Sequence, residues 1–100
     1  MIPIEQGVIY SVENIKDPVL AVSKNFFNKS ETAIVCPIVS RASKDPLHIQ
    51  IETGELKGYV LCEHMKLLDL RVRGYKKVSE ISLEELVNIT DAVQSIFDYY

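Results

Sequence analysis

The sequence has few cysteines, no excess of positive charge and no long apolar run, and each shortage excludes a class of protein. Two cysteines among 100 residues are too few for the disulfide framework of a small secreted domain. Both stand in apolar runs, which predicts buried, reduced thiols. The net charge of −3 argues against a general nucleic-acid binder but leaves room for a local basic face.

No segment has membrane-spanning length, and the N-terminal residues do not have the pattern of a secretion signal. We therefore predict a cytoplasmic protein without membrane contact. Apolar residues make up 47% of the chain and charged residues 25%, which is ordinary globular composition. A chain of this length has room for one hydrophobic core, so we predict a single domain over residues 1–100.

Alternating and apolar segments predict a sheet of many short strands. The expected strands cover residues 8–13, 19–23, 33–39, 47–52, 58–61 and 68–72. The second of them is apolar on both faces and should be central. Phe26 and Phe27 lie in a polar loop that they should tuck against the core, and Pro37 marks a bulge or an edge position. One helical turn is expected within residues 62–67, and His48 should be solvated on an outward strand face.

The C-terminal segment has a clear helix signal. Ser82 and Glu85 form a capping box, and Ile81 and Leu86 are placed for a hydrophobic staple across it. An apolar stripe at helical spacing should dock the helix on the sheet; its members are Leu86, Ile89, Val93, Ile96, Phe97 and Tyr100. Many short strands and a terminal helix predict a small, strongly curved antiparallel barrel of the mainly β, α+β class.

Several short segments, in a fixed order, carry a family resemblance. They are GVIY at residues 7–10, PVLAVS at residues 18–23, Asn28, VCPIVS at residues 35–40, GYVLCEHMK at residues 58–66, and residues 71–74 and 83–86. In this order and spacing they resemble the MazF/PemK family of bacterial toxins over nearly the whole chain. The third of the apolar segments corresponds to a strand that runs into the family's active-site loop.

The resemblance implies an SH3-like barrel with helices, usually a homodimer. It implies sequence-specific cleavage of single-stranded RNA with no metal and no cofactor, in which the ribose 2′-hydroxyl attacks the neighbouring phosphate. That reaction needs a proton acceptor, a proton donor and support for the phosphorane. An arginine before the second-strand proline and a threonine after the third strand usually supply this. A cognate antitoxin, whose peptide occupies the RNA groove, holds the toxin inactive.

Three departures from the family pattern bear on activity. Asp17 stands at the position of the arginine, so an anion replaces a phosphate-facing cation. Val39 stands at the position of the threonine and has no hydroxyl. The turn at residues 14–16 is shorter than the family's flexible first loop. We interpret Asp17 as a turn residue that hydrogen-bonds its own backbone, in preference to a catalytic carboxylate.

Other residues are candidates for the lost roles. Ser40 and Arg41 could be a relocated catalytic pair, with Arg41 as a phosphate clamp; the alternative is a solvated loop over residues 40–46. The candidate RNA-binding residues are Arg41, Lys44, Arg71, Arg73, Tyr75 and Lys76, with Tyr75 able to stack on a base. A solvated strand end is the competing interpretation.

The segment Cys62-Glu63-His64 suggests a metal or acid–base site. Adjacent side chains point in different directions, so we predict no metal site there. His64 takes the place of the family's usual glutamine and is a weaker candidate for a general base. Phe97, Tyr99 and Tyr100 could complete a dimer or antitoxin surface, with core packing as the alternative for Phe97.

Two functions follow. The first is a toxin that cleaves single-stranded RNA at a rearranged site. The second is a catalytically inactive member of the family that binds a protein: an antitoxin, a regulator, or a target of the kind that the gyrase-poisoning CcdB toxins bind.

Overall fold

A computed structural model describes residues 4–97, which form one curled antiparallel sheet with a helix at its end. The strands are β1 (Val8–Val12), β2 (Val19–Ala21), β3 (Thr32–Val39), β4 (His48–Glu52), β5 (Lys57–Leu61), β6 (Lys66–Asp69) and β7 (Tyr75–Glu80). Two 3-10 turns, η1 (Phe27–Ser30) and η2 (Leu70–Val72), and the helix α1 (Leu83–Ser95) complete the fold. The strand order is β4-β5-β3-β2-β1-β7, with β6 also beside β3. The predicted mainly β barrel with a C-terminal helix is confirmed.

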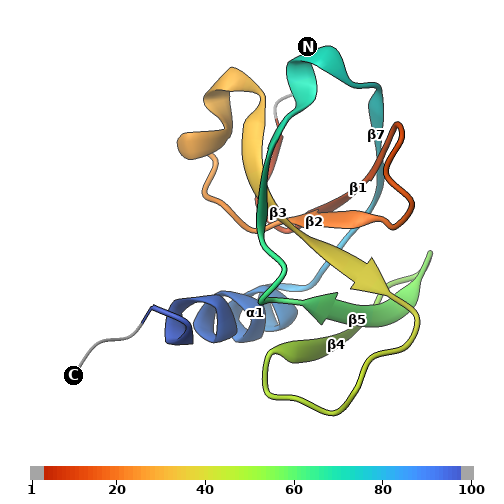
Figure 1. Cartoon of the computed structure of the whole chain (residues 1–100), viewed down its shortest axis with the longest axis vertical. Helices are drawn as coiled ribbons and strands as arrows, with labels where there is room; N and C mark the ends of the chain where they lie inside the picture. Colours follow the sequence, from red (N-terminus) through yellow and green to blue (C-terminus); the bar gives the residue numbers. More distant parts are fainter. Residues whose placement is uncertain (1–3, 98–100) are drawn as a thin grey trace.

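The strand β3 joins the two halves of the molecule (Figure 1). It pairs with β2 on one edge and, in succession, with β6 and β5. Pro37 stands where the partner changes, between Val35 opposite Lys66 and Ile38 opposite Val60. The Ile38 N–H donates to Pro18 on the β2 side, and neighbouring residues alternate. The N–H that Pro37 lacks would therefore point into the gap between β6 and β5, so the proline interrupts no ladder bond there.

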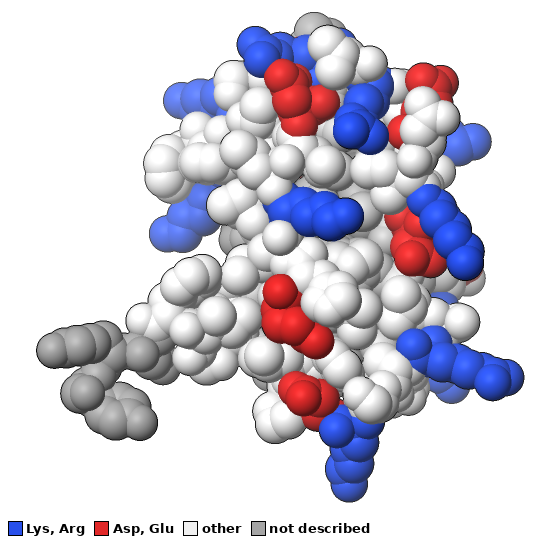
Figure 2. Space-filling view, viewed as in Figure 1, with Lys and Arg blue, Asp and Glu red and all other residues white. Residues whose placement is uncertain are grey.

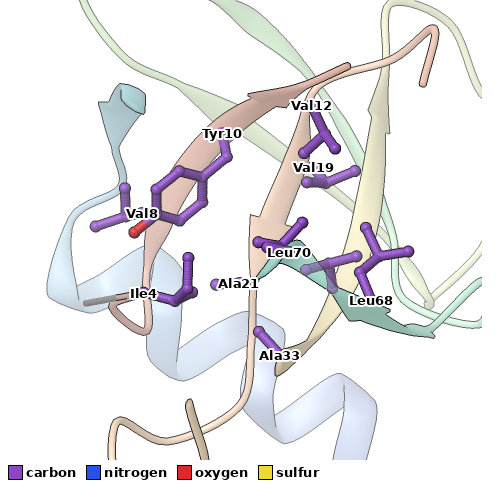
Figure 3. Packing of buried hydrophobic residues seen from close by; sticks show 10 residues of the cluster. Ile4, Val8, Tyr10, Val12, Val19, Ala21, Ala33, Leu68 and Leu70 are labelled. Atoms are coloured by element: carbon purple, nitrogen blue, oxygen red, sulfur yellow. The ribbon is translucent and has the colours of Figure 1, made fainter. Parts of the chain in front are cut away.

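The sheet is buried on both faces. Val8, Tyr10 and Val12 pack with residues of β2, β3 and β6 in a first core cluster (Figure 3). Ile9 and Leu20, which alternate with them, belong to a second cluster that includes Ile89 of α1. The prediction of a central β2 is confirmed, since all three of its residues are buried.

Both cysteines are buried free thiols in the second cluster, as predicted. Burial raises the pKa of Cys36 to about 12 and that of Cys62 to about 11. Desolvation penalises the thiolate form at both positions, so these groups act as small apolar side chains.

The prediction that Phe26 and Phe27 tuck their loop against the core is wrong. These side chains are 70% and 42% exposed. Asn28 takes the inward place instead: its amide oxygen accepts from the Ser23 hydroxyl at 2.6 Å, and its Nδ2 donates to the Ser23 carbonyl at 3.0 Å. The Ser23 hydroxyl in turn accepts from the Ile34 N–H at 2.9 Å. The loop is therefore anchored by a satisfied polar network rather than by aromatic burial.

Two further predictions need correction. The expected helical turn in residues 62–67 is a non-helical turn followed by β6, and the strand expected over residues 68–72 ends at Asp69. Asp69 caps the turn η2 by accepting from the Arg71 N–H at 3.0 Å.

The strand β7 was not predicted. Its pairing with β1 shifts register between Ile9 and Tyr10, and such a bulge breaks the alternation by which a strand is recognised.

The helix α1 begins as predicted. Ser82 and Glu85 form the capping box, with the Glu85 N–H donating to the Ser82 hydroxyl at 3.1 Å. The carboxylate of Glu85 accepts from the Ser82 N–H at Oε1 and from the Glu52 N–H at Oε2, each at 3.0 Å. The second of these bonds joins the start of the helix to the end of β4. The stripe is docked at Ile89 but leaves Phe97 70% exposed. Tyr99 and Tyr100 lie outside the described residues.

No helix within residues 4–97 is long and apolar enough to cross a membrane.

Gly58 gives a test of the β3–β5 junction. A Cβ at this position would lie 2.7 Å from the Val39 carbonyl oxygen, which is backbone and cannot move aside. We expect Gly58→Ala to lower the free energy of unfolding by about 1–3 kcal/mol, measured by urea denaturation. Gly54→Ala is the matched control, since its Cβ would meet no atom within 4 Å. Equal midpoints for the two variants would contradict the close packing of β5 on β3.

Candidate functional site

A groove opens beside the turn between β1 and β2. A hollow of about 410 Å³ is lined by Asn14, Ile15, Lys16, Asp17, Pro37, Val39, Leu61, His64 and Lys66. A second hollow, of about 360 Å³, shares four of these residues and adds Val19, Val35, Leu68 and Arg73. Because the two hollows share their walls, we treat them as one feature, the β1–β2 groove. Asp17 and Val39, the two positions at which the sequence predicts a departure from the family pattern, both line it.

The groove keeps its shape because the β1–β2 turn is short and is hydrogen-bonded where it leaves β1. Asn14 adopts a left-handed φ of 67°, a conformation that asparagine tolerates better than most residues. The Ile15 N–H donates to the Val12 carbonyl at 3.1 Å, and the Glu13 N–H donates to the Gly74 carbonyl at 2.7 Å. These bonds hold Lys16 and Asp17 at the rim. The side chain of Asp17 takes part in no hydrogen bond within residues 4–97, so the predicted bond to its own backbone is absent.

The groove is locally cationic in an acidic chain. Its lining contains Lys16, Lys66 and Arg73 against the single carboxylate of Asp17, whereas the whole chain carries a net charge of −3. On the face drawn in Figure 2, basic and acidic side chains are interspersed over the surface. On this face the charges do not form a broad basic patch, so the excess of positive charge that we describe is a local property of the groove lining.

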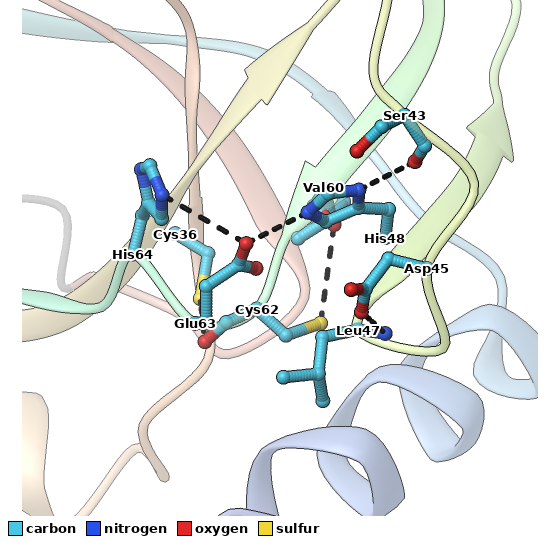
Figure 4. Close-up of polar contacts among 9 residues, drawn as sticks. All are labelled: Cys36, Ser43, Asp45, Leu47, His48, Val60, Cys62, Glu63 and His64. Carbon is cyan, nitrogen blue, oxygen red and sulfur yellow. Dashed lines mark hydrogen bonds and ion pairs between the residues drawn. The ribbon is translucent and has the colours of Figure 1, made fainter.

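Ser40 and Arg41 follow Val39 directly but are exposed and lie outside the groove lining given above. Their loop is held by His48, whose Nδ1 donates to the Ser43 carbonyl at 2.7 Å. The other ring nitrogen, Nε2, donates to Glu63 Oε2, also at 2.7 Å (Figure 4). The prediction of a solvated His48 is wrong, because its side chain is only 11% exposed.

A ring nitrogen that faces a carbonyl or a carboxylate must carry a proton to bond with it, so this clamp favours the imidazolium form. The bond to the Ser43 carbonyl and then the bond to Glu63 raise the pKa of His48. The bond from His48 lowers the pKa of Glu63. The clamp joins the 40–47 loop to the turn after β5.

His64 lies on the other side of the same carboxylate. Its Nε2 is 3.8 Å from Glu63 Oε2, too far for a hydrogen bond, and its side chain is 57% exposed at the groove. Figure 4 shows Glu63 between the two histidine rings. Within the described range of 4–97, no three His, Cys, Asp or Glu side chains gather closely enough to hold a metal ion.

The predicted RNA-binding residues do not gather at one place. Arg73 lines the groove, but Arg71 forms an ion pair with Asp69 at 2.6 Å. That guanidinium lowers the pKa of Asp69 to about 2. The Tyr75 hydroxyl donates to Glu31 at 3.1 Å, and its ring meets that of Tyr10 edge-on.

Lys76 borders a separate hollow formed with Ser11, Glu13, Gly74 and Tyr75. Lys44 is exposed in the clamped loop. Sequence reasoning missed Lys16 and Lys66 as groove residues. The sequence position of each could have indicated a place in the groove, since Lys16 precedes Asp17 and Lys66 ends the family-like segment of residues 58–66.

The curled antiparallel sheet, the terminal helix and the groove beside the first hairpin define a small SH3-like barrel. The family model described as "PemK-like, MazF-like toxin of type II toxin-antitoxin system" matches residues 8–97, and the chain belongs to this family. No curated protein sequence matches it significantly.

Solved structures share the fold. MazF in a MazE-MazF crystal form from Deinococcus radiodurans superposes with a TM-score of 0.88 at 21% identity, covering 100% of both chains. An endoribonuclease in complex with its cognate antitoxin from a mycobacterial species gives 0.81 at 18% identity, covering 94% of both chains. The Mycobacterium tuberculosis toxin MazF-mt6 gives 0.75 at 14% identity, over 93% of this chain and 98% of that one.

The His48 clamp predicts a pH-dependent stability. A raised histidine pKa adds stability that is complete below the ordinary value of 6.5 and is lost as pH rises through the folded value. A lowered Glu63 pKa adds stability that is complete above the ordinary value of 4.5 and is lost as pH falls. Both contributions are therefore complete between pH 4.5 and 6.5.

We expect His48→Gln to lower the urea midpoint more at about pH 5.5 than at about pH 9. His64→Gln is the matched control, because His64 makes no hydrogen bond to Glu63, and its effect should vary less between these two conditions. If the loss caused by His48→Gln is the same at both pH values, the charged clamp is wrong.

Proposed function

We propose that this toxin-family protein cleaves single-stranded RNA bound in the β1–β2 groove and that it acts as a homodimer. The observation that carries the proposal is the local positive charge of Lys16, Lys66 and Arg73 around Asp17 and Val39. A cationic groove attracts a phosphodiester backbone and concentrates it where the family resemblance expects the reaction.

The reaction needs cationic or hydrogen-bonding support for the phosphorane that forms when the 2′-hydroxyl attacks. Asp17 stands in place of the arginine that usually gives this support. The neighbouring cations Lys16 and Lys66 compensate for the missing positive charge. Ser40 and Arg41 follow the groove residue Val39 in the chain. In this proposal Arg41 clamps a phosphate, and the Ser40 hydroxyl donates a hydrogen bond to it. The clamped loop reduces the entropy lost when Arg41 engages the phosphate.

The proposed partner is a cognate antitoxin. Neighbours in fold include MazE-MazF complexes and an endoribonuclease with its cognate antitoxin. An acidic antitoxin segment would satisfy the groove cations and compete with RNA for the same place. Leu83 and Val87 on α1, and Phe97 just beyond its end, leave apolar surface exposed. This supports a protein contact there, such as the second copy in a dimer.

A second candidate is a protein-binding module without chemistry. It is favoured by the carboxylate of Asp17 in the groove, which repels a phosphate. It is also favoured by Val39, which offers no hydroxyl at the position of the family threonine.

The first test is RNA cleavage by the purified protein in the presence of a metal chelator. We expect cleavage of a long single-stranded RNA, its loss in Arg41→Ala, and weaker RNA binding in Lys66→Ala with a salt dependence smaller by about one phosphate contact. Lys29→Ala is the control, because Lys29 is exposed in η1, away from the groove lining. No cleavage across diverse RNAs would overturn the enzymatic proposal.

Expression in a bacterium separates the two candidates. RNA cleavage should arrest growth and degrade bulk RNA. Growth arrest with intact RNA indicates a protein target, and unimpaired growth indicates a silent binding module. Rescue by a small acidic protein encoded beside the gene would support a toxin-antitoxin pair under either mechanism.

A further inference from the structure

We propose that Asp17 and His64 are the acid–base pair of the β1–β2 groove, with the Asp17 carboxylate as proton acceptor and the His64 imidazolium as proton donor. The inference rests on the proposed cleavage of RNA and assigns two roles that Ser40 and Arg41 do not fill. It also gives a function to the residue that replaces the family arginine.

The Asp17 carboxylate lies at the groove and makes no hydrogen bond within the described residues. Asp17 is only half-exposed. The Pro18 that follows restricts its backbone, and the Pro18 carbonyl accepts from the Ile38 N–H at 2.9 Å. A carboxylate that no structural bond uses, carried by a restrained backbone at the rim of a groove, is available to accept a proton from a bound hydroxyl.

His64 reaches the same groove from another element. Its backbone N–H donates to the Leu61 carbonyl at 3.1 Å, and the preceding Cys62 is buried. Glu63 Oε2, 3.8 Å from the ring Nε2, is held by its bond to His48. Glu63 and His48 are therefore positioning residues, which support the turn that carries His64. The ring itself is open to a ligand.

The remaining charges at the site favour a phosphate between the pair. Lys16 adjoins Asp17, Lys66 follows His64 by two residues on β6, and Arg73 lies in the adjoining hollow. Glu63 and Asp17 are the carboxylates near His64. Groove lysines attract the non-bridging phosphate oxygens, where charge increases in the transition state.

The proposed step conserves atoms and charge. Asp17 takes the proton of the 2′-hydroxyl, and the 2′-oxygen forms a bond to phosphorus. The bond from phosphorus to the 5′-oxygen breaks, and the imidazolium of His64 gives its proton to that oxygen. The products are a 2′,3′-cyclic phosphate and a 5′-hydroxyl end, and a proton exchange with water restores both side chains. No oxidant, reductant or metal takes part.

The first experiment is the pH dependence of single-turnover cleavage by the full chain. The wild type should give a bell-shaped profile, because activity needs an ionised carboxylate and a protonated imidazole. Asp17→Asn should lose the acidic limb and His64→Gln the alkaline limb, each with a rate lower by about 100-fold or more. RNA affinity should persist in both variants. Asp91→Asn, the same change on the exposed side of α1, should retain the wild-type rate and profile.

A second experiment separates the acid from the base. An RNA whose leaving 5′-oxygen is replaced by sulfur needs little protonation of its leaving group. This substrate should restore the rate of His64→Gln but not that of Asp17→Asn, an outcome that a merely structural role for His64 does not produce. His64→Gln introduces the residue usual for the family at this position, so the variant is expected to fold, which thermal unfolding checks.

The outcomes are distinct. If the wild type cleaves RNA and both variants keep its rate and its bell-shaped profile, the acid–base assignment is overturned and the proposed function stands. If sulfur restores neither variant or both, the division of roles is overturned. If the wild type cleaves no RNA, the proposed function and this inference fall together.

Discussion

The pairing of β3 with three other strands is the constraint on which the rest of the structure depends. Its first half is bonded to β6 and its second half to β5, while β2 runs along the opposite edge. Pro37 occupies the one interval where a missing N–H interrupts no ladder. The same change of partner places Val39, the β1–β2 turn and the start of β6 around one hollow. The groove is therefore a consequence of the strand topology and not of a mobile loop.

Much of this fold could be predicted from the sequence, but less of the candidate site. The capping box at Ser82 and the alternation of Val8, Tyr10 and Val12 are local patterns, so they predict local structure correctly. The strand β7 was not predicted because a bulge in its pairing with β1 breaks the alternation of buried and exposed side chains along the strand. The error at Phe26 has a related origin, since a tertiary hydrogen-bond network around Asn28 outweighs aromatic burial in this loop. Neither effect can be read from neighbouring residues alone.

The groove was harder to predict because its charges come from distant segments. Lys16, Lys66 and Arg73 are separated in the sequence and meet only through the sheet. A search for a dense basic stretch instead selects residues 71–77, where Arg71 is paired with Asp69 and Tyr75 is bonded to Glu31. The surroundings of a charge in the fold, rather than its density along the chain, decide whether it is free to meet a phosphate.

The substitution at Asp17 also has a different meaning in its surroundings. An arginine at this position can donate two hydrogen bonds to a phosphate, and a carboxylate cannot. Yet a transition state for 2′-hydroxyl attack needs both a cation and a base. With Lys16 and Lys66 beside it, the groove already has cations, so an anion there can serve as the base without leaving the phosphate charge uncompensated. A carboxylate at the same place without these lysines would only repel the substrate. In the proposed reaction the two lysines are therefore as necessary as Asp17.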